Sequence, residues 1–194
     1  MNTFKKRTFT LPLLAASAAA ALRQFPVAVR ALRRPATSRA LQEEVMLAVT
    51  SVNDCRYCDW VHTGLALEAG VDLAALHATL SGGDRCLSER DAAAVFYAQH
   101  FAETQRQPTA QARARLHAHF SPAEVRELEA FIDLIWFANL SGNSADAVLA
   151  RLRGQEVPEG HALAELLAAA LAAPVLAGIA LRGRKNADRP LAAL

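Results

Sequence analysis

Two cysteines, Cys55 and Cys58, have a spacing that could support thiol chemistry. Residues i and i+3 share one face of a helix, so the two sulfurs lie close enough to bridge. His62 follows Cys58 by four residues and falls on the same face. At the start of a helix, unpaired backbone N–H groups stabilise a thiolate, and a nearby imidazole can accept the thiol proton. The pattern predicts a redox-active pair that forms a nucleophile at neutral pH.

Other interpretations of this cluster stay open. A thioredoxin-type motif requires a βαβ setting, and strand patterns are missing from the sequence. A zinc site would use the two cysteines and His62, with Cys86 as the remaining thiol, but three ligands on one helical face close poorly around a tetrahedral ion. The cysteines could also simply fill a core. We expect dithiol–disulfide chemistry with neither a metal nor a cofactor.

A wider pattern includes Glu43, which precedes Cys55 by twelve positions. Together with the C-x-x-C and His62, it resembles the signature of the AhpD-like (alkyl hydroperoxidase D) proteins of the carboxymuconolactone decarboxylase superfamily. The segment 139–143, Asn-Leu-Ser-Gly-Asn, resembles the Asn-rich turn near the end of that domain. The resemblance covers residues 38–153 and implies an all-helical oligomer. It also implies a hydroperoxide substrate and a disulfide or lipoyl-type electron donor.

The resemblance also implies a role for each site residue. Cys58 would attack the peroxide, and Cys55 would resolve the product as a disulfide. His62 would take the proton from Cys58. Glu43 would orient His62 or act through it by way of a water molecule.

The chain departs from the family pattern at two positions. Tyr57 stands where the best-known members have a histidine between the cysteines, and Asp54 stands where they have a small residue. Two alternative functions stay open beside peroxide reduction. One is a decarboxylase-like lyase acting on a cyclic lactone, which is disfavoured because that branch lacks the C-x-x-C. The other is a non-catalytic redox-sensing or membrane-associated protein whose disulfide state changes a partner surface.

The elements that must position these residues are expected to be helices. Aromatic residues make up only 6% of the chain while alanine and leucine dominate, which predicts an all-α fold. Capping and stop signals predict helices at Ser38–Asn53, Cys55–Gly70, Asp72–Gly82, Ser88–Gln105, from Pro108, from Ser121 to a stop at Gly142, and from Asn143 or Ser144 to Arg153.

Several residues are assigned to solvent or packing instead of chemistry. Glu44 is expected to be solvated because adjacent helical residues point in different directions. Trp60 and Trp136 are expected to anchor a core or an interface. Four histidines lack the spacing of metal ligands and are expected to be surface or packing residues: His77, His100, His117 and His119.

Charge is distributed unevenly around a net value of +2. Residues 1–40 carry +8 and residues 175–194 carry +3, which leaves −9 for the middle of the chain. Nucleic-acid binding needs a sustained basic face, so an acidic body predicts no nucleic-acid partner.

Both ends of the chain are apolar as well as basic. Residues 4–22 are typical of an export signal, or of a basic amphipathic arm that lies on a membrane or a neighbouring subunit. Residues 162–181 carry one charge, Glu165, and approach the length of a membrane span. Pro174 and Gly178 within this stretch favour a buried or interfacial pair of helices.

These features divide the chain into an N-terminal arm (1–37), a central AhpD-like domain (38–153) and an apolar helical extension (154–194). Excess apolar surface at the ends predicts a homo-oligomer. We expect a cytoplasmic protein with peripheral membrane contact through its termini, with export as the alternative.

Overall fold

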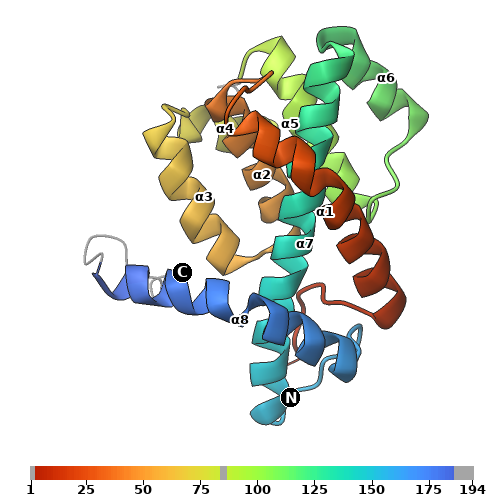
Figure 1. Ribbon diagram of the computed structural model, residues 1–194, viewed down its shortest axis with the longest axis vertical. Coiled ribbons are helices and arrows are strands. Elements are labelled where there is room, and N and C mark those ends of the chain that lie inside the picture. Colours follow the sequence, from red (N-terminus) through yellow and green to blue (C-terminus); the bar gives the residue numbers. More distant parts are fainter. Residues whose placement is uncertain (1–2, 84–86, 186–194) are drawn as a thin grey trace.

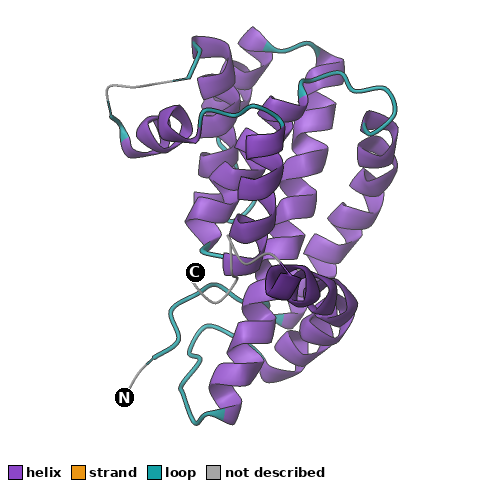
Figure 2. Ribbon diagram, turned by 90° about the vertical axis from the view of Figure 1, so that its left-hand side faces the viewer, coloured by secondary structure: helices purple, strands orange, loops and turns teal. Residues whose placement is uncertain are grey.

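The computed structural model describes residues 3–83 and 87–185, and this part of the chain is built from eight α-helices without a strand (Figures 1 and 2). The all-α prediction is therefore confirmed. The helices are α1 (Leu11–Ala31), α2 (Arg39–Asn53), α3 (Arg56–Glu68), α4 (Leu73–Ser81), α5 (Glu89–Glu103), α6 (Ala110–His119), α7 (Pro122–Leu152) and α8 (Ala162–Lys185).

The long helix α7 is the axis of the fold, and α1, α2, α3 and α8 all pack against it (Figure 1). Its start is the predicted capping box. The Ser121 hydroxyl accepts a hydrogen bond from the Glu124 N–H (3.4 Å), and the Glu124 carboxylate accepts one from the Ser121 N–H (2.8 Å). Pro122 occupies the first helical position, where its missing N–H costs nothing.

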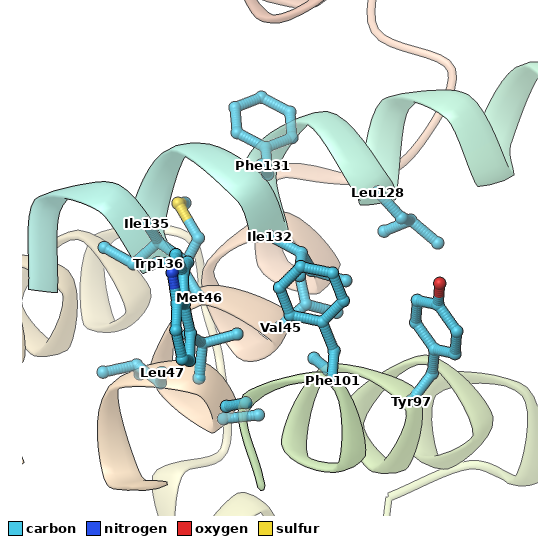
Figure 3. Packing of buried hydrophobic residues seen from close by; sticks show 14 of the residues in the cluster. Val45, Met46, Leu47, Tyr97, Phe101, Leu128, Phe131, Ile132, Ile135 and Trp136 are labelled. Atoms are coloured by element: carbon cyan, nitrogen blue, oxygen red, sulfur yellow. The ribbon is translucent and has the colours of Figure 1, made fainter. Parts of the chain in front are cut away.

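The main core lies where α2, α5 and α7 meet (Figure 3). Trp136 of α7 is fully buried, and its ring meets Phe101 edge to face with centroids 6.1 Å apart. The Trp136 indole N–H donates to the Ser17 hydroxyl of α1 (3.3 Å), so its one polar atom is satisfied. Trp60 is also buried. The prediction of a packing anchor is confirmed for Trp136, which lies in the main core cluster.

Gly142 does not end a helix, and this prediction is wrong. Helix α7 continues through it to Leu152 without interruption. A Cβ atom placed on Gly142 would lie only 2.8 Å from the Cys55 sulfur and 3.2 Å from the Tyr57 ring. The glycine is therefore explained by the close approach of α3 to the middle of α7.

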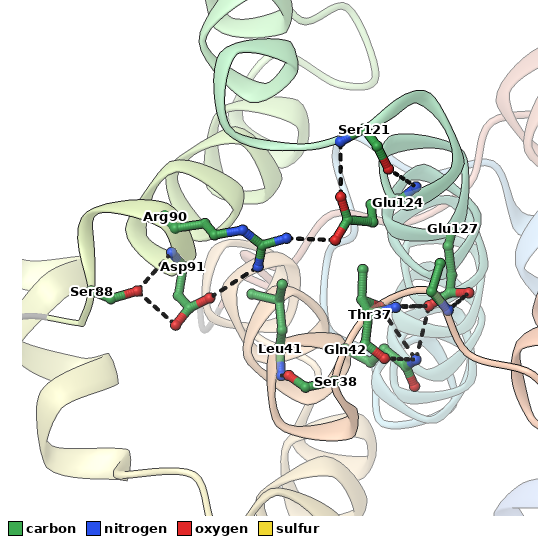
Figure 4. Close-up of polar contacts among 11 residues, drawn as sticks. Thr37, Ser38, Leu41, Gln42, Ser88, Arg90, Asp91, Ser121, Glu124 and Glu127 are labelled. Atoms are coloured by element: carbon green, nitrogen blue, oxygen red, sulfur yellow. Dashed lines mark hydrogen bonds and ion pairs between the residues drawn. The ribbon is translucent and has the colours of Figure 1, made fainter.

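A buried carboxylate fixes the chain just before α2 (Figure 4). Glu127 of α7 accepts hydrogen bonds from the backbone N–H groups of Ala36 (2.8 Å) and Thr37 (2.9 Å). It also accepts bonds from the Thr37 hydroxyl (2.5 Å) and the Gln42 amide (3.1 Å). Ser38 then caps α2 as predicted. These contacts set the position of α2 on α7, and with it the position of Glu43.

Two of the described helices, α1 and α8, are long and apolar enough to cross a membrane by length and composition. Both are packed on α7. Phe9, just before α1, is fully buried, with its ring centroid 5.7 Å from that of Phe137.

Helix α8 is continuous, so the predicted helix pair is wrong. Pro174 removes one backbone hydrogen bond, but the alanine and leucine residues around it favour helix strongly enough to continue.

Candidate functional site

The cysteine pair lies at a sharp junction between α2 and α3. Asp54 ends α2 in the left-handed conformation (φ 54°), and Cys55 then forms the N-cap of α3. The sulfurs of Cys55 and Cys58 are 3.1 Å apart. Both are buried free thiols. The prediction that the spacing brings the two sulfurs together is confirmed.

The two thiols differ in their electrostatic surroundings. The hydrogen bond from the Cys58 thiol lowers the pKa of Cys55, and the backbone N–H groups of Cys58 and Tyr57 add to this against the opposing effect of burial. The charge of Lys6 acts in the same direction. Donation to Cys55, together with burial, raises the pKa of Cys58 well above its usual value. The Cys58 thiol, and to a smaller extent the helix start, therefore favour the thiolate on Cys55.

Glu43 and His62 form a direct pair between α2 and α3. The Glu43 carboxylate is fully buried, and its Oε2 atom lies 2.7 Å from Nδ1 of His62. A carboxylate only accepts hydrogen bonds, so Nδ1 is assigned as the protonated nitrogen and Nε2 is left free to accept a proton. The contact is direct, so the predicted participation of a water molecule is not required.

Arg39 completes the surroundings of Glu43. Its guanidinium lies 2.5 Å from Oε1 of Glu43, one helical turn away, in an ion pair without regular hydrogen-bond angles. The buried carboxylate is thus held between a cation and an imidazole. This pairing offsets the cost of burying a charge.

The expectation for Glu44 is wrong. Its side chain is buried, and burial together with the charge of Asp91 raises its pKa to about 7. Helix α2 is covered by α7 on one side and α5 on another, so neighbouring positions on it can both be buried.

A polar cluster that sequence reasoning missed surrounds Tyr57. The Tyr57 hydroxyl donates to Asp146 of α7 (2.8 Å), and the Arg56 guanidinium also lies 2.8 Å from this carboxylate. Lys6 lies 3.5 Å from Asp54 and 3.9 Å from Asp146. Burial raises the pKa of Tyr57. The middle of the C-x-x-C is therefore tied to α7.

Asn143 joins three segments next to the thiols. Its amide donates to the backbone oxygens of Asn53 (2.7 Å) and Arg7 (3.1 Å). Asn139, one turn earlier, accepts from the Thr50 hydroxyl (3.2 Å). The Asn-rich segment is thus part of a helix and not a turn. The sequence did contain a signal for these contacts. Two asparagines four residues apart lie on one face of an apolar helix, and buried amides need hydrogen-bond partners on a neighbouring segment.

An apolar cavity of about 250 Å³ borders Cys58. Tyr57 and Cys58 of α3 form one side, α7 contributes Phe137 and Gly142, and α8 closes it with residues that include Val175. Cys55 does not line this cavity. Its walls suit a small apolar group, and Cys58 is the sulfur that such a group would meet.

The remaining candidates do not assemble into a metal site. In the described ranges, no group of three or more His, Cys, Asp or Glu side chains could hold a metal ion. Cys86, the fourth ligand considered for zinc, lies outside the described residues. His77 and His117 are exposed, His119 is partly buried, and His100 accepts a bond from the Thr109 N–H (3.3 Å).

No family model, curated protein or solved structure matches this chain. The resemblance to AhpD-like proteins therefore stays a prediction from the cysteine pair, His62, Glu43 and the 139–143 segment.

Proposed function

We propose that this chain is an AhpD-like thiol oxidoreductase that reduces hydroperoxides through Cys55 and Cys58. The observation that carries the proposal is the 3.1 Å contact between two free thiols at the start of α3. Closing this contact to a disulfide of about 2.05 Å requires a movement of only about 1 Å. The pair can therefore store and release two electrons without a large rearrangement.

The first step transfers one oxygen atom of the peroxide to a sulfur. A Cys58 thiolate attacks the terminal oxygen of the hydroperoxide, the O–O bond breaks, and Cys58 becomes a sulfenic acid. His62 takes the proton from Cys58 and returns it to the departing alkoxide, which leaves as an alcohol. The buried Glu43 holds the imidazole in the required tautomer.

The second step resolves the sulfenic acid. The Cys55 thiolate attacks the Cys58 sulfur, a disulfide forms, and hydroxide leaves as water after taking a proton. One hydroperoxide is thereby reduced to an alcohol and water while two thiols are oxidised. A disulfide or lipoyl-type donor in its dithiol form then restores both thiols by exchange.

Two observations bear on which sulfur attacks first. The cavity borders Cys58, which supports Cys58 as the attacking atom. The lowered pKa of Cys55 supports a standing thiolate there, which suits the resolving step but also favours Cys55 as an attacker. We assign the attack to Cys58, because access to the peroxide is required before a lowered pKa can help.

Peroxide consumption in the presence of dihydrolipoamide tests the proposal. Cys58→Ser should abolish turnover. Cys55→Ser should reduce one equivalent of peroxide and stop at a sulfenic acid on Cys58 that dimedone traps. The matched control is Cys86→Ser, which removes the third thiol of the chain and should leave turnover unchanged.

Two results would count against these assignments. A sulfenic acid on Cys55 in the Cys58→Ser variant would reverse the two roles. A pair that stays reduced in strongly oxidising glutathione buffer, with peroxide left unconsumed, would remove the proposed function itself.

A further inference from the structure

Helix α8 has an unusual distribution of polarity. Its only acid, Glu165, is fully buried and lies 2.6 Å from the Arg151 guanidinium. Residues 166–181 carry no charge. The large side chains that it exposes up to residue 181 are aliphatic: Leu163, Leu166, Leu167, Leu171, Val175 and Leu181. A helix on a water-facing surface normally exposes its polar side, and α8 does the opposite.

Helix α1 exposes a second apolar stripe, and this one lies among arginines. Leu22, Phe25, Val29 and Leu32 are exposed at spacings of three, four and three residues, which places them on one face. Arg23, Arg30, Arg33 and Arg34 are exposed beside them. Apolar side chains flanked by arginines are typical of helices that lie in a membrane interface.

The two helices lie on one side of the molecule. In Figure 1, α1 and α8 both cross in front of α7, and the two helices also contact each other. Leu171 and Val175 line the cavity beside Cys58, so they are not part of this surface. The other four exposed leucines of α8 share one face of the helix. We give the name docking face to these four leucines, the four apolar side chains of α1 and its C-cap, and the four arginines that flank them. Arg182 ends the apolar stretch of α8 and is also exposed.

We propose that the docking face binds an anionic membrane surface. The aliphatic residues would enter the boundary between headgroups and acyl chains, and the arginines would contact anionic headgroups. Charge favours this occupant over a second copy of the chain. A face-to-face dimer would bring the arginines of two copies together, whereas anionic lipids neutralise them. The proposal does not depend on peroxidase activity.

Flotation of the full chain with phosphatidylcholine vesicles, with and without phosphatidylglycerol, tests the proposal. We expect binding to the anionic vesicles and little to the neutral ones. Leu166→Glu combined with Leu181→Glu should lower anionic binding at least tenfold. These side chains are 56% and 58% exposed, so the fold should tolerate the change. Phe96→Glu on α5, at 51% exposure, is the matched control and should bind normally.

A charge variant separates the electrostatic contribution. Arg23→Gln combined with Arg30→Gln should weaken anionic binding about twenty-fivefold at low salt, from about fivefold for each arginine. High salt should reduce this difference. Failure of the full chain to float with anionic vesicles would overturn the proposal. So would normal binding by both double variants, or a dimer that Leu166→Glu with Leu181→Glu converts to monomer while neither form binds vesicles.

Discussion

Replacing Gly142 by alanine would put a methyl group too close to the Cys55 sulfur. The new carbon would be 2.8 Å from that sulfur and 3.2 Å from the Tyr57 ring. Carbon and sulfur normally approach no closer than about 3.5 Å, so the sulfur must move by most of an ångström. That movement acts directly on the 3.1 Å contact between the two thiols.

The size of the effect follows from two opposing contributions. Alanine stabilises a helix relative to glycine by about 0.5–1 kcal/mol. Overpacking of a buried contact costs about 1–3 kcal/mol. Gly178 of α8 supplies the matched control, because a Cβ there would meet no atom within 4 Å. Gly178→Ala should therefore raise the free energy of unfolding, while Gly142→Ala should leave it about 1–3 kcal/mol below that control.

Urea unfolding measures the stability of both variants, and thiolate absorbance against pH measures the thiol. Displacing Cys55 from the Cys58 thiol removes the main cause of its lowered pKa, so Gly142→Ala should raise the pKa of Cys55. Adding Cys55→Ala should remove most of the stability cost of Gly142→Ala, because the clashing sulfur is gone. Equal stabilisation by Gly142→Ala and Gly178→Ala, with an unchanged titration of Cys55, would refute the predicted clash.

Three further predictions concern the charge of Glu44, the pair formed by Glu43 and His62, and the oligomeric state of the protein. Glu44→Gln should stabilise the fold by about 1–2 kcal/mol at pH 8, and should have little effect below pH 4.5. The pKa of Glu44 is about 7 in the folded chain and 4.5 in the unfolded chain, so ionisation favours the unfolded state and stability is lost as the pH rises from 4.5 to 7. Urea unfolding at pH 4 and pH 8 measures this loss and its absence in Glu44→Gln. His62→Ala should slow peroxide reduction about a hundredfold and move its onset to higher pH, and Glu43→Gln should do so by about tenfold, as read from pH–rate profiles; an unchanged profile would remove both from the mechanism. The AhpD-like resemblance implies an oligomer, and the membrane proposal requires that it form through a surface other than the docking face, so light scattering should give a multiple of 20.8 kDa; a particle of 20.8 kDa at micromolar concentration would contradict it.

Local signals in the sequence were enough to locate most helix starts. Ser38, Asp72 and Ser121 cap helices as predicted, because a capping side chain satisfies backbone groups within a few residues of itself. The closeness of the Cys55 and Cys58 sulfurs follows from the same short-range geometry.

Other features depend on segments far apart in the chain, and there local reasoning failed. Gly142 has the chemistry of a helix stop, but its role is set by Cys55, which is distant in sequence and adjacent in space. Glu44 was expected to be solvated because the sequence around it does not reveal that α5 packs over this side of α2. The contacts of Asp146 and Asn143 with the start of α3 and the end of α2 have the same long-range origin.

The anchoring of Glu165 has a consequence for how the molecule opens. Ala164, Glu165 and Ala168 are fully buried, and Glu165 accepts hydrogen bonds from Arg151 and Thr8, whereas no residue between 169 and 182 is buried. Helix α8 is thus fixed at one end, and Pro174 interrupts its backbone ladder midway. Local unfolding should therefore start at the far end and stop near Glu165. Amide hydrogens after Pro174 should exchange much faster than those of the core, and each such opening would expose Cys58 while the bundle stays folded.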